Sequence, residues 1–195
     1  MTETTLFSIN EYLALEKKAE EKHEYQNGTI VKRKSSSLAH AIICTNALAK
    51  FSNQEKEYLT LDSQIKIFIE KANSFVYPDG VVIWEKPKFP PQTNHAITNP
   101  NLIIEVTSDT TESYDRGRKL HFYSTLSSLK EYILIDQNKA VVDSFHRDEN
   151  NLWKIRIIEG LDKSFPIHTL GFDINMADLY KKVPNLKNPQ FNLDL

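Results

Sequence analysis

The sequence predicts an α/β domain that contains both parallel and antiparallel pairs of strands. Short apolar runs bounded by Gly, Pro and Asn are typical of buried strands, and such runs occur on either side of Asp79, at 102–104 and at 131–136. A helical pattern separates the last two runs, and a helix that crosses over between two strands of one sheet makes them parallel. Asn-Gly between two β-prone segments predicts an antiparallel hairpin as well.

One domain accounts for the length. The chain has 195 residues, which is enough for a single domain with a substantial core. We assign this domain to residues 1–180. We expect the Asn- and Pro-rich residues 181–195 to form a mobile C-terminal tail.

The composition limits the classes of function. The chain has 24 basic and 26 acidic residues and a formal net charge of -2, so it lacks an overall basic signature of nucleic-acid binding, although a groove can still be locally basic. The single cysteine, Cys44, excludes an internal disulfide and fits a reducing compartment. No secretory signal and no apolar run of roughly 20 residues is visible. We therefore expect a cytoplasmic protein that has no contact with a membrane.

The N-terminal elements carry clear local signals. Ser8 and Glu11 have capping-box spacing, which predicts a helix that starts after Ser8 and ends near Ala19. Asn27-Gly28 between β-prone flanks predicts a type I′ hairpin. Glu24 lies in the first arm of this hairpin, and the local pattern predicts a surface carboxylate.

A second helix is predicted at 38–51, where apolar residues recur at helical spacing. Cys44 in this helix is expected to be a small core residue rather than a nucleophile. His40 lies in the first turn, and the local pattern predicts only a structural or exposed histidine there.

The next segment alternates between apolar and polar side chains over residues 58–69, which predicts one half-buried strand. A turn at 70–74 then predicts an antiparallel hairpin with the strand that contains Asp79. The segment 85–100 contains four prolines and has no periodicity. A long irregular loop of this kind is either a mobile flap that faces substrate or a disordered insertion.

A third helix is predicted at 114–126, although Gly117 weakens its first turns. The remaining predicted elements are a strand at 131–136, a hairpin formed by 140–148 and 152–160, and a short helix at 175–182.

Asp79 and Glu105 lie within or at the end of apolar strands, where an unpaired charge is costly. Such carboxylates are normally paired, protonated or bound to a metal, and Lys119 on the following helix can bring a positive charge to them. Carboxylates hold Mg²⁺ or Mn²⁺, the ion lowers the pKa of a bound water, and a lysine can stabilise charge that develops on a phosphodiester. The plainer interpretation is a turn at Asp79, an ion pair at Glu105 and a solvated Lys119.

Other chemistries have less support. The sequence contains no P-loop and no GxGxxG motif, and its six histidines include no HExxH pattern. No GxSxG motif indicates a serine hydrolase. Asp79 and Glu105 could form a glycosidase-type acid–base pair, which the short α/β chain and the nearby lysine disfavour.

A combination of short motifs runs through the chain. It consists of Glu24-Tyr25 before Asn27-Gly28, His40, Tyr77-Pro78-Asp79, the run from Leu102 to Ser108, Asp115-Arg116 with Lys119 and Tyr123, and Glu131-Tyr132. This combination resembles a large family of uncharacterised restriction endonucleases that is common in photosynthetic bacteria, within the PD-(D/E)xK nuclease superfamily. The resemblance covers roughly Ile9 to Leu179.

The resemblance implies a restriction-endonuclease-like core, which is a mixed central β-sheet flanked by helices. It implies Asp79 and Glu105 as catalytic metal ligands, and Glu24 as a third acidic member of the metal site. Thr107 stands where the superfamily signature has a lysine. In this family a lysine of the following helix is thought to substitute for it, and Lys119 matches that position.

Two further residues have supporting roles. His40 matches the helix histidine of the family. Tyr123 shares a helix face with Lys119, because the two lie four residues apart, and it is expected to pack against or orient the lysine.

The functional hypothesis is a Mg²⁺- or Mn²⁺-dependent endonuclease that acts on DNA as a homodimer, since a two-fold pair presents equivalent sites to the two strands of a duplex. Phe145, Trp153 and Ile157 are candidates for the dimer contact, and their alternative place is the core. The alternative function is a non-catalytic nucleic-acid-binding or regulatory protein that retains the nuclease fold. A locally basic surface beside Asp79 would favour the nuclease.

Overall fold

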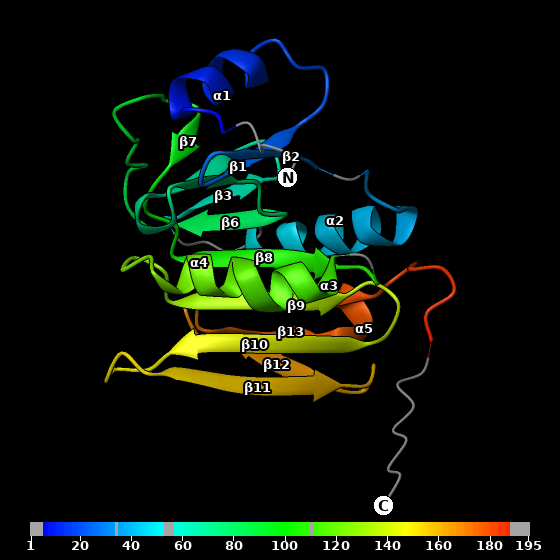
Figure 1. The fold of residues 1–195 in the computed structure, drawn as a ribbon. Coiled ribbons are helices and arrows are strands. Elements are labelled where there is room, and N and C mark those ends of the chain that lie inside the picture. The colour runs from blue at the N-terminus through cyan, green and yellow to red at the C-terminus, as the bar shows by residue number, and fades with distance from the viewer. Residues whose placement is uncertain (1–5, 34, 53–56, 110, 188–195) are drawn as a thin grey trace, which may run out of the picture.

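The computed structural model describes residues 6–33, 35–52, 57–109 and 111–187. They form two β-sheets of five and six strands, a two-stranded sheet, and helices that pack against them (Figure 1). Both larger sheets are mixed, because each contains one parallel pair among antiparallel pairs. The predicted α/β class is confirmed.

The six-stranded sheet is the centre of the fold. Its strand order is β11-β10-β9-β8-β6-β3. Only β8 and β9 are parallel, and the helical segment that joins them is the predicted crossover. The strands are β3 (Leu59–Asp62), β6 (Gly80–Ile83), β8 (Leu102–Thr107), β9 (Glu131–Asp136), β10 (Val141–Arg147) and β11 (Trp153–Glu159).

The five-stranded sheet lies above the first sheet in the view of Figure 1. Its order is β2-β1-β5-β4-β7, and only β4 and β7 are parallel. The predicted Asn27-Gly28 hairpin joins β1 to β2, and both turn residues have the positive φ angles, 46° and 98°, of a type I′ turn. The strands are β1 (His23–Gln26), β2 (Thr29–Lys32), β4 (Lys66–Ile69), β5 (Ser74–Val76) and β7 (Ala96–Ile97).

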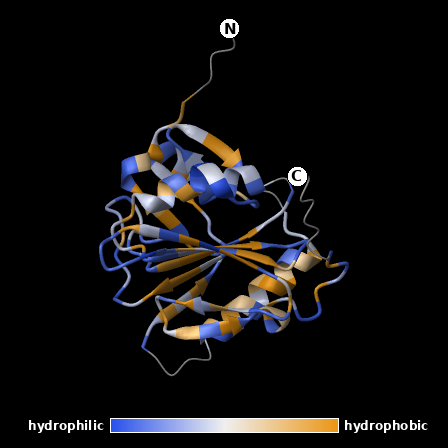
Figure 2. Cartoon of the chain, turned by 90° about the horizontal axis from the view of Figure 1, so that it is seen from below, coloured by the Kyte–Doolittle hydropathy of each residue, from blue (hydrophilic) through white to orange (hydrophobic). Residues whose placement is uncertain are grey.

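Apolar side chains fill the space on both faces of the six-stranded sheet. Alternate residues of β8 point to opposite faces: Leu102, Ile104 and Val106 contact one cluster, and Ile103 contacts the other. Helix α2 (Leu38–Ser52), α5 (Met176–Leu179) and the hairpin of β12 (Ser164–Ile167) with β13 (Phe172–Asn175) cover the first face. A continuous helical segment and strands β4 and β5 cover the second face. Figure 2 shows the apolar residues along the central strands and many hydrophilic residues on the loops.

The helical segment over the second face runs through α3 (Glu112–Tyr114), η2 (Asp115–Lys119) and α4 (Leu120–Ser124). It corresponds to the helix predicted at 114–126. Its middle part, η2, is π-helical and contains Gly117, which was predicted to weaken the helix. Helix α1 (Ile9–Glu16) has the predicted capping box but ends three residues before Ala19.

One strand prediction was wrong. Residues 58–69 form two strands rather than one, because a turn at Asp62–Ile65 separates β3 from β4. β3 pairs with β6 in the six-stranded sheet, whereas β4 pairs with β5 and β7 in the other. Every residue of β4 is buried, so this half of the predicted strand is not half-buried. The predicted antiparallel hairpin across residues 70–74 is present between β4 and β5, but β5 ends at Val76, so Asp79 lies after this strand rather than within it.

The segment 85–100 is held in place and lies away from the cleft described below. The side chain of Asn99 accepts a hydrogen bond from the Lys88 amide at 2.8 Å and donates one to the Lys86 carbonyl at 3.2 Å. Ala96 and Ile97 form β7 and are buried. This segment is therefore neither a substrate-facing flap nor a disordered insertion.

The C-terminal part of the described chain continues along the core. Val183 and Leu186 pack against the first apolar cluster, and the Lys187 amide donates a hydrogen bond to the Asn138 carbonyl at 2.8 Å. The rest of the expected tail, 188–195, lies outside the described residues. Among the described helices, none has the length and apolar character to cross a bilayer.

Candidate active site

Asp79 lies at the joint between β5 and β6, where the chain passes from one sheet to the other. Its carboxylate is 4% exposed. Oδ2 accepts hydrogen bonds from the Val106 amide at 2.8 Å and from Nε2 of His40 at 3.0 Å. Oδ1 is paired with the guanidinium of Arg33. The structure therefore places His40 against Asp79, whereas Arg33 had no recognisable signal in the sequence.

Glu105 faces the helical segment that covers the second face of the sheet. Glu105 lies two residues after Ile103 on β8, so its side chain points to the same face of the sheet as that of Ile103. The side chain of Glu105 is 3% exposed. Oε1 accepts hydrogen bonds from Lys119 Nζ at 2.9 Å and from the Tyr123 hydroxyl at 2.8 Å. Oε2 accepts none from the described residues. The shared helix face of Lys119 and Tyr123 thus meets Glu105.

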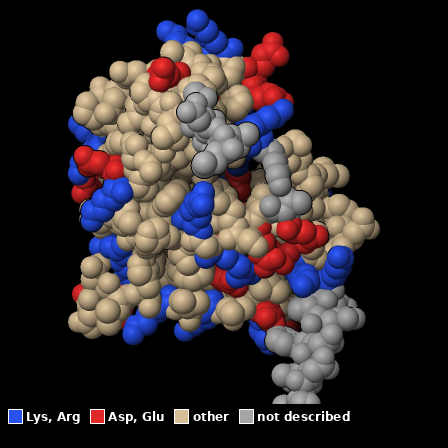
Figure 3. Space-filling model, in the orientation of Figure 1, with Lys and Arg blue, Asp and Glu red and all other residues tan. Residues whose placement is uncertain are grey.

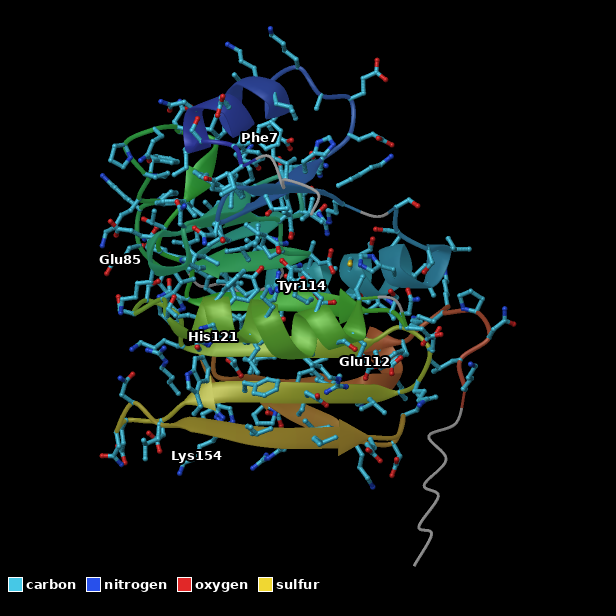
Figure 4. All side chains as sticks on the ribbon, in the orientation of Figure 1. Phe7, Glu85, Glu112, Tyr114, His121 and Lys154 are labelled. Atoms are coloured by element: carbon cyan, nitrogen blue, oxygen red, sulfur yellow. The ribbon has the colours of Figure 1, made fainter. Side chains whose placement is uncertain are left out.

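Glu24 belongs to this cluster, so its prediction as a surface carboxylate from the local pattern was wrong. Residues at positions 24 and 25 of β1 are both buried, because the five-stranded sheet is packed on both sides there. Oε1 accepts a hydrogen bond from the Tyr77 amide at 3.1 Å and lies 3.7 Å from Lys119 Nζ. Oε2 accepts the Tyr114 hydroxyl at 2.9 Å. Figure 4 shows Tyr114 at the helical segment.

Asp115 is a fourth buried carboxylate that the sequence prediction did not include. Oδ1 lies 3.5 Å from Nζ of Lys119, four residues further along η2. Both side chains point inward, whereas Arg118 reaches Gln26 at the surface. The four-residue spacing from Lys119 was a signal that could have identified Asp115. π-Helical turns are frequent at functional sites.

The buried charges of this cluster do not balance. It contains four carboxylates (Glu24, Asp79, Glu105, Asp115), and the cations in contact with them are Lys119 and Arg33. With every carboxylate ionised, the four negative charges exceed the two permanent positive charges of Lys119 and Arg33 by two, leaving aside His40, which carries a charge only when it is protonated.

The pKa directions follow from this imbalance. Burial raises the pKa of Glu105 to about 8, against the opposing charge of Lys119. Burial also raises the pKa of Asp115. For Asp79, the hydrogen bond and charge of His40 and the charge of Arg33 outweigh burial and keep its pKa below the ordinary value. Burial works against the ammonium of Lys119, but the carboxylates, Glu105 foremost, raise its pKa well above the usual range. The cluster thus tends to take up protons at Glu105 and Asp115.

A cleft of about 1280 Å³ opens onto these carboxylates. Its floor contains the acidic cluster, and its rim carries Lys22, Lys32 and Arg118 against Glu21 and Asp109. The rim is therefore of mixed charge with one basic residue in excess, and Lys32 is paired with Glu21. Figure 3 shows acidic and basic side chains interspersed over one face of the molecule, as expected from the near-zero net charge.

The residues of the cluster fit a hard divalent cation. Mg²⁺ and Mn²⁺ take oxygen ligands, and the excess of two carboxylates matches the charge of one such ion. A second grouping, formed by His40, Cys44 and Asp79, places ligand atoms within 4.8 Å of one another. It suits a metal less well, because burial raises the pKa of the Cys44 thiol well above its ordinary value and disfavours the thiolate that binds metals.

Comparison with known proteins identifies the family. The Uma2 family, described as "Putative restriction endonuclease", matches residues 9–177. The chain belongs to the Uma2 family. The resemblance seen in the sequence is thereby confirmed.

Two relatives from Synechocystis sp. span most of the chain. "Uncharacterized protein sll1609" is 33% identical over 159 residues, covering 80% of this chain and 90% of the relative. "Uncharacterized protein slr1290" is 29% identical over 176 residues, covering 89% and 91%. A crystal structure from Anabaena variabilis, of "a putative nuclease belonging to DUF820", superposes with a TM-score of 0.70 at 16% identity and covers 89% of this chain and 97% of that one. The fold of this Uma2 member is thus that of a solved structure.

Proposed function

We propose that this Uma2 protein is a Mg²⁺- or Mn²⁺-dependent endonuclease that hydrolyses phosphodiester bonds in DNA. The observation that carries the proposal is the excess of two buried carboxylates at the floor of an open cleft. Buried charge without compensation is costly, and a divalent cation compensates it. Family membership supports the nuclease class, and the basic rim residues Lys22, Lys32 and Arg118 suit a polyanionic substrate.

In this proposal Asp79 and Glu105 hold the metal ion, with Glu24 as the third acidic residue. A bound ion supplies a water of lowered pKa and neutralises charge on the phosphoryl oxygens. Glu105 offers Oε2, which no described residue occupies. Asp79 stays oriented through the hydrogen bonds of His40 and Val106 to Oδ2.

Lys119 is the proposed catalytic cation. Its ammonium donates a hydrogen bond to the attacking water or stabilises the negative charge that develops on the phosphate. Lys119 thereby takes the role of the signature lysine, whose position on β8 is occupied by Thr107. Tyr123 holds Glu105 in place through the bond to Oε1. Glu105, Lys119 and Tyr123 are all buried and come from β8 and the helical segment.

One observation favours a non-catalytic alternative. Lys119 lies within ion-pair distance of three carboxylates and is 6% exposed. In this alternative, Lys119 neutralises the carboxylates and has no catalytic role. The protein then binds nucleic acid, or has a regulatory function, without cleaving DNA. The cleft, with Lys22, Lys32 and Arg118 at its rim, would then form the binding surface.

Metal-dependent cleavage and metal binding together test the proposal. Supercoiled plasmid, linear duplex and single-stranded DNA are incubated with the protein and Mg²⁺ or Mn²⁺, and the melting temperature is measured with and without metal. We expect cleavage and a rise in melting temperature in the wild type, and the loss of both in Asp79→Ala/Glu105→Ala. Asp162→Ala is the control, because Asp162 is exposed and its recorded side-chain partner is the neighbouring Lys163. A metal response in the double variant equal to that of the wild type would refute the metal site.

A further inference from the structure

Arg33 is the most accessible charged group in contact with the cluster. It follows β2, and its backbone amide is fixed by a hydrogen bond to the Lys22 carbonyl at 2.8 Å. The guanidinium pairs with Oδ1 of Asp79. The Arg33 side chain is 19% exposed, compared with 4% for Asp79, and it lines the open cleft.

The two cations of the cluster differ in how firmly they are held. Lys119 contacts three carboxylates, a backbone carbonyl and the ring of Tyr114, and it is almost fully buried. Arg33 contacts a single carboxylate among the described residues, and its side chain reaches the cleft. If another cation binds Asp79, Arg33 can move away and leave no unpaired carboxylate. Lys119 cannot do the same, because its departure would leave three carboxylates without their cation.

We propose that Arg33 exchanges partners during DNA binding: it pairs with Asp79 when no metal is bound, and with a DNA phosphate when a divalent cation occupies Asp79. This inference rests on the proposed function. The guanidinium would thus compete with the metal in the free protein and hold the substrate in the loaded one.

Electrostatics supports each half of the exchange. A divalent cation at Oδ1 of Asp79 removes the acceptor of Arg33 and repels the guanidinium. Asp79 keeps its orientation, because His40 and Val106 still bind Oδ2. The released guanidinium has a planar set of donors that matches a phosphate group, and it already lies at the cleft.

The test compares wild type, Arg33→Met, Arg33→Lys and Lys32→Met. Mn²⁺ affinity is measured by calorimetric titration. Affinity for a labelled DNA duplex is measured by fluorescence anisotropy in Ca²⁺, which takes the same oxygen ligands, over a range of salt concentrations. Lys32→Met removes a rim charge of the same sign that pairs with Glu21 rather than with Asp79. Circular dichroism and thermal melting confirm folding of each variant.

We expect Arg33→Met to bind Mn²⁺ roughly tenfold more tightly, since a competing cation is gone. We also expect it to bind DNA more weakly, with the slope of log affinity against log salt reduced by about 0.9, the value for one lost phosphate contact. Arg33→Lys should bind Mn²⁺ nearly as the wild type does and bind DNA more weakly, because it keeps the charge but loses the planar fork. Lys32→Met should leave Mn²⁺ affinity unchanged.

Weaker or unchanged Mn²⁺ binding in folded Arg33→Met overturns the exchange and indicates a purely structural arginine. Tighter Mn²⁺ binding with an unchanged salt slope also overturns it, because the phosphate contact is then absent. If neither wild type nor Arg33→Met binds Mn²⁺, the metal site itself fails, and the proposed function fails with it.

Discussion

Lys119 Nζ lies 2.9 Å from Oε1 of Glu105, and neither side chain is more than 6% exposed. The same ammonium lies 3.7 Å from Glu24 and 3.5 Å from Asp115. A buried ion pair stabilises a fold only when its geometry and hydrogen bonds compensate for lost hydration, and here one cation serves three carboxylates. Lys119 therefore determines the stability of the metal-free cluster as well as its proposed chemistry.

Replacing Lys119 by Met should affect stability and catalysis differently. Without metal, Lys119→Met should lower the free energy of unfolding by about 3–5 kcal/mol, the cost of leaving buried charges unpaired. Mn²⁺ should restore part of this loss by mass action. At saturating metal, the cleavage rate should fall by roughly 100-fold or more, the scale of removing one donor to the transition state. Thermal melting and a cleavage assay measure the two effects.

The control for this variant is Lys163→Met, because Lys163 pairs with Asp162 at the surface. It should change neither stability nor cleavage. A folded, metal-saturated Lys119→Met protein that cleaves at the wild-type rate would eliminate the catalytic role and leave Lys119 as a neutralising charge.

Metal binding should depend on pH through Glu105. Its folded-state pKa of about 8 lies above the value of about 4.3 in unfolded chains. The stability that Glu105 contributes to the metal-free protein is therefore complete below about pH 4.3 and is lost as the pH rises to about 8. A metal ion must displace this proton, so the melting-temperature rise caused by Mg²⁺ should be larger at about pH 8.5 than at about pH 6.

Glu105→Gln is the comparison for this pH dependence, because it keeps the size of the side chain and replaces the ionisable carboxyl group with an amide that does not titrate. Its response to Mg²⁺ should be small and nearly independent of pH over the same range. A wild-type response that is equal at both pH values, or larger at the lower one, would contradict the assignment of Glu105 as a ligand.

Tyr123 should act by positioning Glu105. Tyr123→Phe removes the 2.8 Å hydrogen bond to Oε1 and keeps the ring that packs against Tyr132. We expect the free energy of unfolding to fall by about 1 kcal/mol and Mg²⁺ affinity to fall severalfold, with a smaller loss of cleavage than in Lys119→Met. Calorimetric titration with Mg²⁺ and a cleavage assay, each carried out on Tyr123→Phe and Lys119→Met, measure the two losses. A loss of cleavage as large as that of Lys119→Met at saturating metal would mean that the hydroxyl takes part directly.

Local patterns in the sequence predicted the elements whose signals are themselves local. The capping box at Ser8 and the Asn27-Gly28 turn depend on hydrogen bonds and backbone angles within a few residues, and both are present. Residues 58–69 alternate between apolar and polar side chains although β3 and β4 belong to different sheets. Such alternation shows which side of a strand is apolar, but it does not show which strand pairs with it. The chain forms two strands here because β3 pairs with β6 and β4 pairs with β5, and these pairings are not visible in the local sequence.

The site shows the same limit. The placement of Asp79 and Glu105 in apolar strands was visible as charge where charge is costly. Glu24 and Arg33 gave no such signal, because their burial arises from the packing of the two sheets against the helical segment. Family resemblance supplied Glu24, and only the three-dimensional structure placed Arg33 against Asp79.

The homodimer is the last prediction, and β11 is the surface that supports it. This strand forms one edge of the six-stranded sheet, at the bottom of Figure 1, so one side of its backbone has no strand partner among the described residues. Ile155 and Ile157 on it are 65% and 60% exposed, whereas Phe145, an expected contact residue, is buried against Tyr132 and belongs to the core. Antiparallel pairing of β11 with β11 of a second copy would satisfy the free backbone groups and cover both isoleucines.

Light scattering at micromolar protein concentration tests this pairing. We expect the wild type to have the mass of a dimer and Ile155→Lys/Ile157→Lys to have the mass of a folded monomer, because two added charges face their counterparts across the edge. Phe89→Lys is the matched control, since Phe89 is 52% exposed in the segment 85–100 and has no part in the β11 edge. Plasmid nicking should persist in the monomeric variant while concerted cleavage of both strands declines, because each copy would keep its own carboxylates and Lys119. A monomeric wild type, or a double variant that remains dimeric, would show that β11 is not the interface.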